Sequence, residues 1–449
     1  MTLVKLVIFL AVAPQLSAGE IDQKFHNVLF RQWPMLMTHD AATGYAKDGT
    51  CKTSVPVNNF AVTQPSGGFT KQLECGARAF DLRPYVKHDG KVVMHHGDVV
   101  FDTDIKVAMG DIMKWSESHP NTIVFLNVGT TCGGDNEEAK KKCWSTGAGS
   151  PDSIIEGAGA KYRSDASLKT LTVGEVLTHA KWKSGGAVIY TWAASVESNW
   201  VESIQCYGRA RRLDQNDLNG TDMANAPDRE LIWNHLSHAA HQVADAGTHA
   251  ANKVKEGGKH AYQKGKEAYS SVKDTCWAGD QQKFFDPFWC YFDQTANKNT
   301  PPLDKMYITQ AHWQYDTKSI AIATARQSCI IYDEEHSKMN QKVADKISKN
   351  TYKNLAILQV DNVCDHGPAL ARALLSQAEK RLSNAQQKFD SSLPMLAEAR
   401  APNFKTAIVF LVGGFGVVSA AIAVFRKGFP GCRSSAVADY GTVYNTGEA

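Results

Sequence analysis

The stretch PMLMTHDAATGY, residues 34–45, is the first of three short apolar segments that end in polar residues. GARAFDLRPYV follows at residues 76–86 and KVVMHHGDVVF at residues 91–101. Because successive side chains of a strand point to opposite faces, Asp81 and Arg83 are expected on one face of the second segment. The sequence therefore predicts an acidic and a basic side chain at the end of one strand, close to the histidine that ends another.

Two histidines close apolar runs. His39 follows PMLMT, and His96 stands directly before Gly97, with His95 predicted to point to the opposite face of its strand. An imidazole has an unperturbed pKa near 6.5, so one such ring can act as a base and another as an acid at neutral pH. With Arg83 as a permanent positive charge, the set points to cleavage of an anionic phosphodiester.

The wider pattern alternates strands with helical segments. Near-continuous apolar runs suit parallel strands covered on both faces, and residues 102–120 carry apolar side chains at helical spacing. This pattern fits a (β/α) barrel or an open doubly wound α/β sheet, and the lack of a Gly-rich phosphate loop after the first strand disfavours the second. The predicted strands are PMLMT, RAFDL, KVVMH, NTIVFLNV, GAVIYTW, KMYITQA and NLAILQV.

The two ends of the chain read as targeting and anchoring segments. Residues 1–18 have the layout of a secretory signal peptide, and residues 406–425 run for 20 positions without a charge. This uncharged run predicts a single transmembrane helix. The basic residues that follow it predict a cytoplasmic tail at 426–449 and a large domain in the lumen or outside the cell. The expected protein is thus a single-pass type I membrane protein of the secretory pathway or cell surface, with a barrel at 19–375 and a closing helix and stalk at 376–405.

Cysteines and charge agree with export. Ten cysteines in an exported chain predict disulfides, and the net charge of +3 gives no reason to expect nucleic acid as a partner. Asn219 lies in the only glycosylation sequon and is expected to carry glycan. The plausible disulfide pairs are Cys132 with Cys143, Cys51 with Cys75, and Cys276 with Cys290.

Residues 237–269 form three copies of an 11-residue repeat, with His238, His249 and His260 in register. This spacing keeps one face of a helix aligned, so we expect a helical insertion on the surface of the barrel. A solvated Ala-rich helix is favoured over a helix that contacts the membrane. No set of cysteines or carboxylates completes a metal site with these histidines.

The motifs THDAATG, GARAFDLRPYV, DGKVVMHHGD and HPNTIVFLNV together resemble the X region of phosphatidylinositol-specific phospholipase C and its relatives. The strong similarity covers roughly residues 33–130 and a weaker one extends to about residue 375. The resemblance implies an α/β fold of the (β/α)8 TIM barrel type. It also implies a phospholipase C-like phosphodiesterase in which two histidines act as base and acid.

The resemblance also assigns roles to single residues. His39 would take the proton from the inositol 2-hydroxyl, and His96 would protonate the departing diacylglycerol oxygen, which leaves an inositol cyclic phosphate. Asp361, after the final strand, is expected to orient His39, and Asp40 to assist the acid. Arg83 completes the catalytic set, and substrate binding is assigned to Asp81 and Asn127.

No metal or other cofactor is expected. Calcium needs six to eight oxygen ligands, and the calcium-dependent branch of the family has acidic residues two apart on the second strand. Here Arg83 takes the second of these positions, where its charge would repel a cation and neutralise phosphorane oxygens. Asp40 and Asp81 leave open a weak ion site.

The predicted substrate is an inositol phospholipid or a glycosylphosphatidylinositol (GPI) lipid. An active site that faces away from the cytosol favours the GPI lipid, because free phosphoinositides mostly face the cytosol. Two alternatives remain: a catalytically silent barrel that serves as a surface receptor or adhesion module, and a related glycerophosphodiester or sphingomyelin phosphodiesterase.

Overall fold

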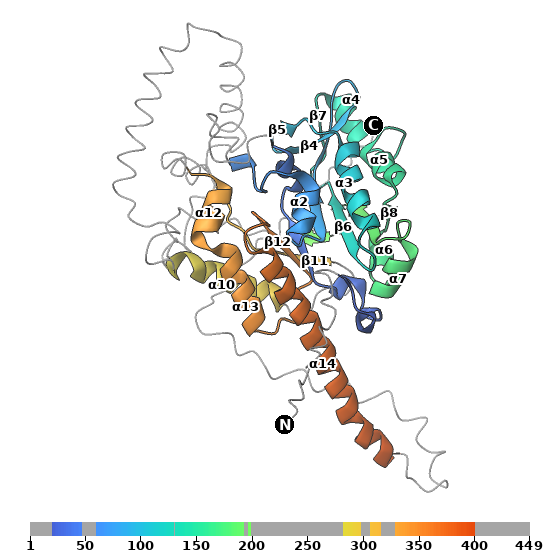
Figure 1. The fold of residues 1–449 in the computed structure, drawn as a ribbon, viewed down its shortest axis with the longest axis vertical. Helices are drawn as coiled ribbons and strands as arrows, with labels where there is room; N and C mark the ends of the chain where they lie inside the picture. Colours follow the sequence, from blue (N-terminus) through green and yellow to red (C-terminus); the bar gives the residue numbers. More distant parts are fainter. Residues whose placement is uncertain are drawn as a thin grey trace, which may run out of the picture. The chain divides into compact units, whose positions relative to one another are not determined.

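The protein is an α/β fold built on a parallel sheet (Figure 1). The structure, a computed structural model, describes residues 20–46, 60–129, 131–192, 196–198, 282–297, 306–315 and 328–399. Eight strands pair in the order β10-β11-β12-β1-β2-β6-β9-β8, and every pairing is parallel. The strands are β1 (Met35–Thr38), β2 (Ala79–Leu82), β6 (Ile123–Val128), β8 (Lys161–Tyr162), β9 (Ala187–Trp192), β10 (Val196–Ser198), β11 (Met306–Gln310) and β12 (Ile357–Val360).

The expected α/β class with a parallel sheet is confirmed, whereas a closed eight-stranded barrel remains a prediction. Within the described ranges, no strand pairing joins β10 to β8 or β9, so the sheet has two edges there. The helices α3, α5 and α7 lie on one flank of the sheet, and α10, α12 and α13 lie on the opposite flank (Figure 1). The helices are α2 (Gly68–Glu74), α3 (Ile105–Glu117), α4 (Glu137–Cys143), α5 (Pro151–Ala158), α6 (Asp165–Leu168), α7 (Val173–His179), α10 (Gln282–Ala296), α12 (Ile330–Ser337), α13 (Met339–Lys349) and α14 (Gly367–Ala399), with 3-10 turns η1 (Gln23–Phe25), η2 (Phe30–Gln32) and η3 (Ala41–Tyr45).

Each predicted apolar run forms a strand, but one of them lies in a different sheet. KVVMH forms β4 (Val92–His96), which pairs antiparallel with β3 (Pro84–Val86) and β5 (Val99–Phe101). A short β7 (Gly133–Gly134) completes this four-stranded sheet. The prediction that His39 and His96 end neighbouring strands of one sheet is therefore wrong. The physical reason is connection length: a parallel neighbour needs a crossover of about a dozen residues or more, and the chain between β2 and β4 is shorter than that.

Side chains on one face of the parallel sheet change character along each strand. Met35 and Met37 are buried in an apolar cluster, and the next side chain on their face is His39. In β12, Ile357 belongs to the same apolar cluster, and Asp361 has the same parity just beyond the strand. The amino-terminal half of this face is thus core, and the carboxyl-terminal end is polar.

Helix α3 shows why the helical prediction succeeds. Its apolar positions recur at helical spacing, and its first turn is capped by Asp104, which accepts a hydrogen bond from the backbone N–H of Lys106. The predicted apolar stripe is buried against the sheet, and its members are Ile105, Ala108, Met109, Ile112 and Trp115.

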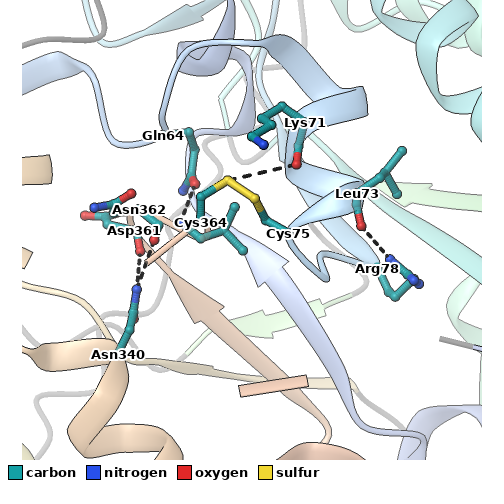
Figure 2. The surroundings of a disulfide bond; sticks show 10 residues. Gln64, Lys71, Leu73, Cys75, Arg78, Asn340, Asp361, Asn362 and Cys364 are labelled. Atoms are coloured by element: carbon teal, nitrogen blue, oxygen red, sulfur yellow. Dashed lines mark hydrogen bonds between the residues drawn. A yellow bond between two sulfur atoms is a disulfide. The ribbon is translucent and has the colours of Figure 1, made fainter. Parts of the chain in front are cut away.

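Two disulfides join described residues. The predicted Cys132–Cys143 bond is confirmed. The predicted bond between Cys51 and Cys75 is wrong, because Cys75 is bonded to Cys364, which lies 289 residues further along the chain (Figure 2). This bond joins the end of α2 to the loop after β12, a long-range contact that sequence spacing did not suggest.

Several predictions concern residues outside the described ranges. They are the signal peptide at 1–18, the repeat at 237–269, Asn219, Cys276 and the transmembrane helix at 406–425. Within the described ranges, no helix is both long enough and apolar enough to span a bilayer. The chain divides into units 1–382 and 383–449, and in the second unit α14 continues to Ala399 through part of the predicted stalk.

Candidate active site

The turn after β1 places two predicted catalytic residues. The backbone N–H of His39 donates to the carbonyl of Val360 (3.1 Å), which ties the end of β1 to β12. The carbonyl of His39 accepts hydrogen bonds from Thr63 Oγ1 (2.8 Å) and Gln64 Nε2 (3.0 Å). Asp40 then adopts a left-handed backbone with φ of 43°, a conformation that non-glycine residues seldom take. This bend brings the Asp40 carboxylate back toward the His39 ring.

His39 lies between two carboxylates. Its Nδ1 is 2.9 Å from Asp361 Oδ1, and its Nε2 is 3.2 Å from Asp40 Oδ2. Burial lowers the pKa of His39, although Asp40 acts in the opposite direction. Burial raises the pKa of Asp361 to about 7, and His312 offsets part of that rise. Burial thus shifts the pKa values of His39 and Asp361 toward each other, because it disfavours the charged form of both groups.

Arg83 contacts two carboxylates: that of Asp40, which follows β1, and that of Asp81, which lies on β2. Its Nη1 is 2.7 Å from Asp40 Oδ1, and its Nη2 is 2.8 Å from Asp81 Oδ2. Burial alone would raise the pKa of Asp40, but Arg83 and the nearby imidazoles outweigh it and lower that pKa to about 2. Burial also disfavours the charge on Arg83, yet Asp40 and Asp81 raise the pKa of the guanidinium. The site therefore holds a fixed cation at neutral pH.

His96 approaches from the four-stranded sheet. Its Nδ1 is 2.8 Å from the carbonyl oxygen of Ala61, and its Nε2 is 3.1 Å from Asp40 Oδ2. A carbonyl oxygen and a carboxylate oxygen thus lie against the two ring nitrogens of His96, and both contacts orient this ring toward Asp40.

Side chains from other segments hold the backbone of Asp361 and of the loop after β12 (Figure 2). Asn340 Nδ2 donates to the carbonyls of Asp361 (2.9 Å) and Asn362 (3.1 Å). Gln64 Oε1 accepts from the backbone N–H of Val363 (3.1 Å), while Gln64 Nε2 donates to Val360 (2.9 Å). One side chain thus connects the strands that carry His39 and Asp361.

The predicted substrate-binding residues are buried beside one another. Asp81 and Asn127 are paired in register across β2 and β6. Asp81 Oδ2 accepts from the backbone N–H of Asp40 (3.2 Å) as well as from Arg83. Asn127 Oδ1 has no hydrogen-bond partner among the described residues. Asp81 therefore supports Arg83 and Asp40, whereas the Asn127 amide is left with unused hydrogen-bonding capacity.

His312 was missed in the sequence. It follows β11 in the run KMYITQAHW, and its ring stacks on that of His39 with centroids 4.2 Å apart and planes at 13°. The signal was present, because the residue stands two positions beyond Gln310, at the polar end of a strand. Ala61, Gln64 and Asn340 were also missed, and each lies in a segment with no pattern of its own.

Among the residues that the structure describes, two side-chain groups have enough ligand atoms to be considered as metal sites. They are His39 with His312 and Asp361, and His39 with Asp40 and Asp81. The stacked rings of the first group hold their nitrogen lone pairs in nearly parallel planes, which do not converge on a metal about 2 Å from both. The guanidinium of Arg83 lies against both carboxylates of the second group. Neither donor set fits a cation, and metal independence remains a prediction.

The fold is similar to solved phosphatidylinositol-specific phospholipases C from bacteria. One structure of the Staphylococcus aureus enzyme, from work on its membrane binding, is 13% identical, covers 78% of this chain and 95% of its own, and has a TM-score of 0.41. A mutant of that enzyme is 13% identical, covers 80% and 95%, and has a TM-score of 0.39. The Listeria monocytogenes enzyme is 13% identical, covers 77% and 94%, and has a TM-score of 0.37. No protein-family model matches the chain, and no curated protein matches its sequence. These similarities concern the fold, and the family is the one that the sequence motifs resemble.

Proposed function

We propose that this protein is a phospholipase C-type phosphodiesterase that cleaves an inositol lipid by acid–base catalysis. One observation supports the proposal most: the Nε2 atoms of His39 and His96 lie 3.2 and 3.1 Å from the same oxygen of Asp40. The other oxygen of Asp40 contacts Arg83. A base, an acid and a cation therefore surround one small region, as an in-line displacement at phosphorus requires.

The proposed reaction begins at the base. His39 Nε2 removes the proton of the inositol 2-hydroxyl, and Asp361 stabilises the imidazolium that forms. The freed oxygen attacks the adjacent phosphorus, and Arg83 neutralises charge on the phosphorane oxygens. As the bond from phosphorus to the diacylglycerol oxygen breaks, His96 donates its proton to that oxygen. The products are diacylglycerol and an inositol cyclic phosphate.

The proposed substrate is an inositol lipid that is exposed outside the cytosol, and GPI-type glycolipid is the first candidate. The disulfides Cys75–Cys364 and Cys132–Cys143 support this placement, because such bonds persist in oxidising compartments. The proposal includes a signal peptide and a single-pass membrane anchor, both of which concern segments outside the described residues. Neither a metal nor a cofactor has a role in it.

The test uses the purified full chain in detergent micelles. Phosphatidylinositol and a GPI-anchored protein are offered separately, with and without chelator, and the cyclic phosphate is followed by 31P NMR. We expect turnover that survives chelation, with a loss of about 10²–10⁴-fold in His39→Ala and in His96→Ala. His88→Ala is the matched control, because that imidazole also pairs with a carboxylate but is 79% exposed.

The outcomes separate the alternatives. Turnover that chelator abolishes would contradict metal independence. Cleavage of sphingomyelin or a glycerophosphodiester in place of inositol lipids would favour the related phosphodiesterases. No turnover on any of these substrates by a folded chain would indicate a silent receptor or adhesion module.

A further inference from the structure

His312 is a third histidine in the site, and the reaction proposed above gives it no task. Its ring lies almost parallel to that of His39, with centroids 4.2 Å apart. Its Nδ1 is 3.8 Å from Asp361 Oδ2, while Asp361 Oδ1 contacts His39. The two rings therefore lie against the two oxygens of one carboxylate.

The His312 ring is closed off from solvent. Its side chain is fully buried, and its Nε2 has no hydrogen-bond partner among the described residues. Leaving a buried ring nitrogen unpaired costs free energy, so a ring with no task would be replaced at little loss by an apolar one. The position of the ring therefore calls for an explanation other than simple packing.

The chain around His312 is tightly held. Gln314 Nε2 lies 3.1 Å from His312 Nδ1. The backbone N–H of Trp313 donates to Glu334 Oε1 (2.8 Å), and Trp313 Nε1 donates to Ser337 Oγ (2.9 Å). Two residues of α12 thus anchor the residue next to His312, which fixes the plane of its ring.

We propose that His312 is a positioning residue for the base: it stacks on His39, keeps water from that face of the ring, and holds the ring in the plane that joins it to Asp361. This inference rests on the proposed function. By excluding water it keeps His39 unprotonated before the reaction, and by staying neutral it does not repel the imidazolium formed during the reaction.

The charges around the ring are consistent with a neutral His312. Burial lowers the pKa of His312 to about 4, and His39 lowers it further, while Asp361 acts against both. The titratable groups that face it are His39 and Asp40 after β1, Asp361 after β12, and Glu334 of α12 next to Trp313. Burial raises the pKa of Glu334, and Asp361 adds to that rise. At neutral pH the His312 ring is therefore uncharged where it stacks on His39.

The test compares His312→Ala with His312→Phe in the full chain. Alanine opens space beside His39 and admits water, so the pKa of His39 should rise. We expect kcat to fall at least tenfold and the acid limb of kcat/KM to move to higher pH by about one unit. Phenylalanine keeps a ring stacked on His39 and excludes water from that face. The His312→Phe variant should therefore keep the acid limb of the original kcat/KM profile and recover most of the lost kcat.

A second measurement does not depend on turnover. Histidine-selective labelling and NMR titration of the full chain report the pKa of His39 directly, with His39→Gln used to assign the signal. His119→Ala is the matched control, because His119 also stacks on an aromatic ring, that of Trp115, with centroids 3.7 Å apart. Thermal unfolding checks that each variant is folded.

The outcomes are distinguishable. A raised His39 pKa in His312→Ala that His312→Phe reverses supports the inference, even if no phosphodiester proves to be a substrate. An activity loss at every pH with no shift of the limb or of the NMR titration would overturn it and leave a packing role. Equal behaviour of the alanine and phenylalanine variants would overturn it as well.

Discussion

The two histidines of the proposed mechanism lie in regions of different construction. The base region consists of His39 and Asp361 at the carboxyl ends of β1 and β12, within the parallel sheet. The acid region consists of His96 on β4, in the four-stranded sheet. The His39 side chain is 12% exposed and lies between carboxylates, whereas the His96 side chain is 25% exposed and hydrogen-bonds to a backbone carbonyl.

This difference matches the two tasks. A base that must be unprotonated benefits from a dry site, because burial disfavours its cation. The proposed acid is the more exposed of the two imidazoles, so its charged form loses less hydration than that of a fully buried ring. The two regions meet at the Asp40 carboxylate, which contacts both rings and Arg83. Asp40 is therefore the residue whose change should disturb both regions at once.

Asp40→Asn should have the largest effect on activity. The amide keeps the shape of the carboxylate but removes the charge that both imidazoles and Arg83 share. We expect kcat/KM to fall by about 10³–10⁴-fold, more than a change that affects one imidazole alone. Steady-state kinetics on phosphatidylinositol micelles measures the loss.

Asp135→Asn is the matched control, because Asp135 pairs with His88 at 3.1 Å on the surface of the four-stranded sheet. Surface pairs of this kind contribute roughly 0–1 kcal/mol, so its activity should be nearly unchanged. A loss of less than tenfold in a folded Asp40→Asn variant would show that the base and acid regions act independently.

Asp361→Asn should disturb the base region alone. Without the carboxylate, the imidazolium of His39 loses its partner, and we expect kcat to fall about a hundredfold. The same substitution should increase the stability of the fold, relative to the original chain, as pH rises. Folding raises the pKa of Asp361 from its usual 3.8 to about 7, so between these values the folded state binds more protons than the unfolded chain. The stability contributed by this group is full below pH 3.8 and falls as pH rises toward 7.

The amide does not ionise and escapes this loss. The melting temperature of Asp361→Asn relative to the original chain should therefore rise between pH 4 and pH 7, as calorimetry at several pH values would show. His312 partly masks the trend in the original chain, because its lowered pKa makes stability increase with pH between about 4 and 6.5. A pH-independent difference in melting temperature would contradict the prediction.

The parallel sheet and the polar ends of its strands were predictable for a physical reason. In β1 and β12, residues that share a face run from apolar to polar toward the carboxyl end, so parity alone places His39 and Asp361 on one side. His312 has the same signal after β11. The motifs that resemble a known family contain His39 and His96 but not His312.

Other parts of the site carry no local signal. Gln64 binds the backbone of Val360, 296 residues further along the chain, and Asn340 binds the backbone of Asp361, 21 residues away; neither contact leaves a pattern in the sequence. The Cys75–Cys364 bond is of the same kind, because ten cysteines allow many pairings and short spacing favoured Cys51. The position of β4 was a different error, since the short chain after β2 already excluded a parallel crossover.

Removal of either disulfide should change activity less than Asp40→Asn or Asp361→Asn does. Cys75–Cys364 ties the loop of Asp361, in the base region, to α2, and Cys132–Cys143 closes a short loop near the acid region. In the chain-entropy picture, removing a bond across 289 residues costs about 6 kcal/mol of unfolding free energy, and across 11 residues about 3 kcal/mol. Serine replacements of each pair, followed by denaturant unfolding, measure the difference.

The activity of the two double variants tests the comparison itself. The base depends on Asp361, whose loop loses one tie in Cys75→Ser/Cys364→Ser but keeps Asn340 and Gln64, so kcat should fall only several-fold. Cys132→Ser/Cys143→Ser should leave kcat within about twofold, because His96 is held by Ala61 and Asp40 and neither contact involves that loop. If the second variant lost more activity than the first, the acid region, and not the base region, would be the one that depends on its covalent support.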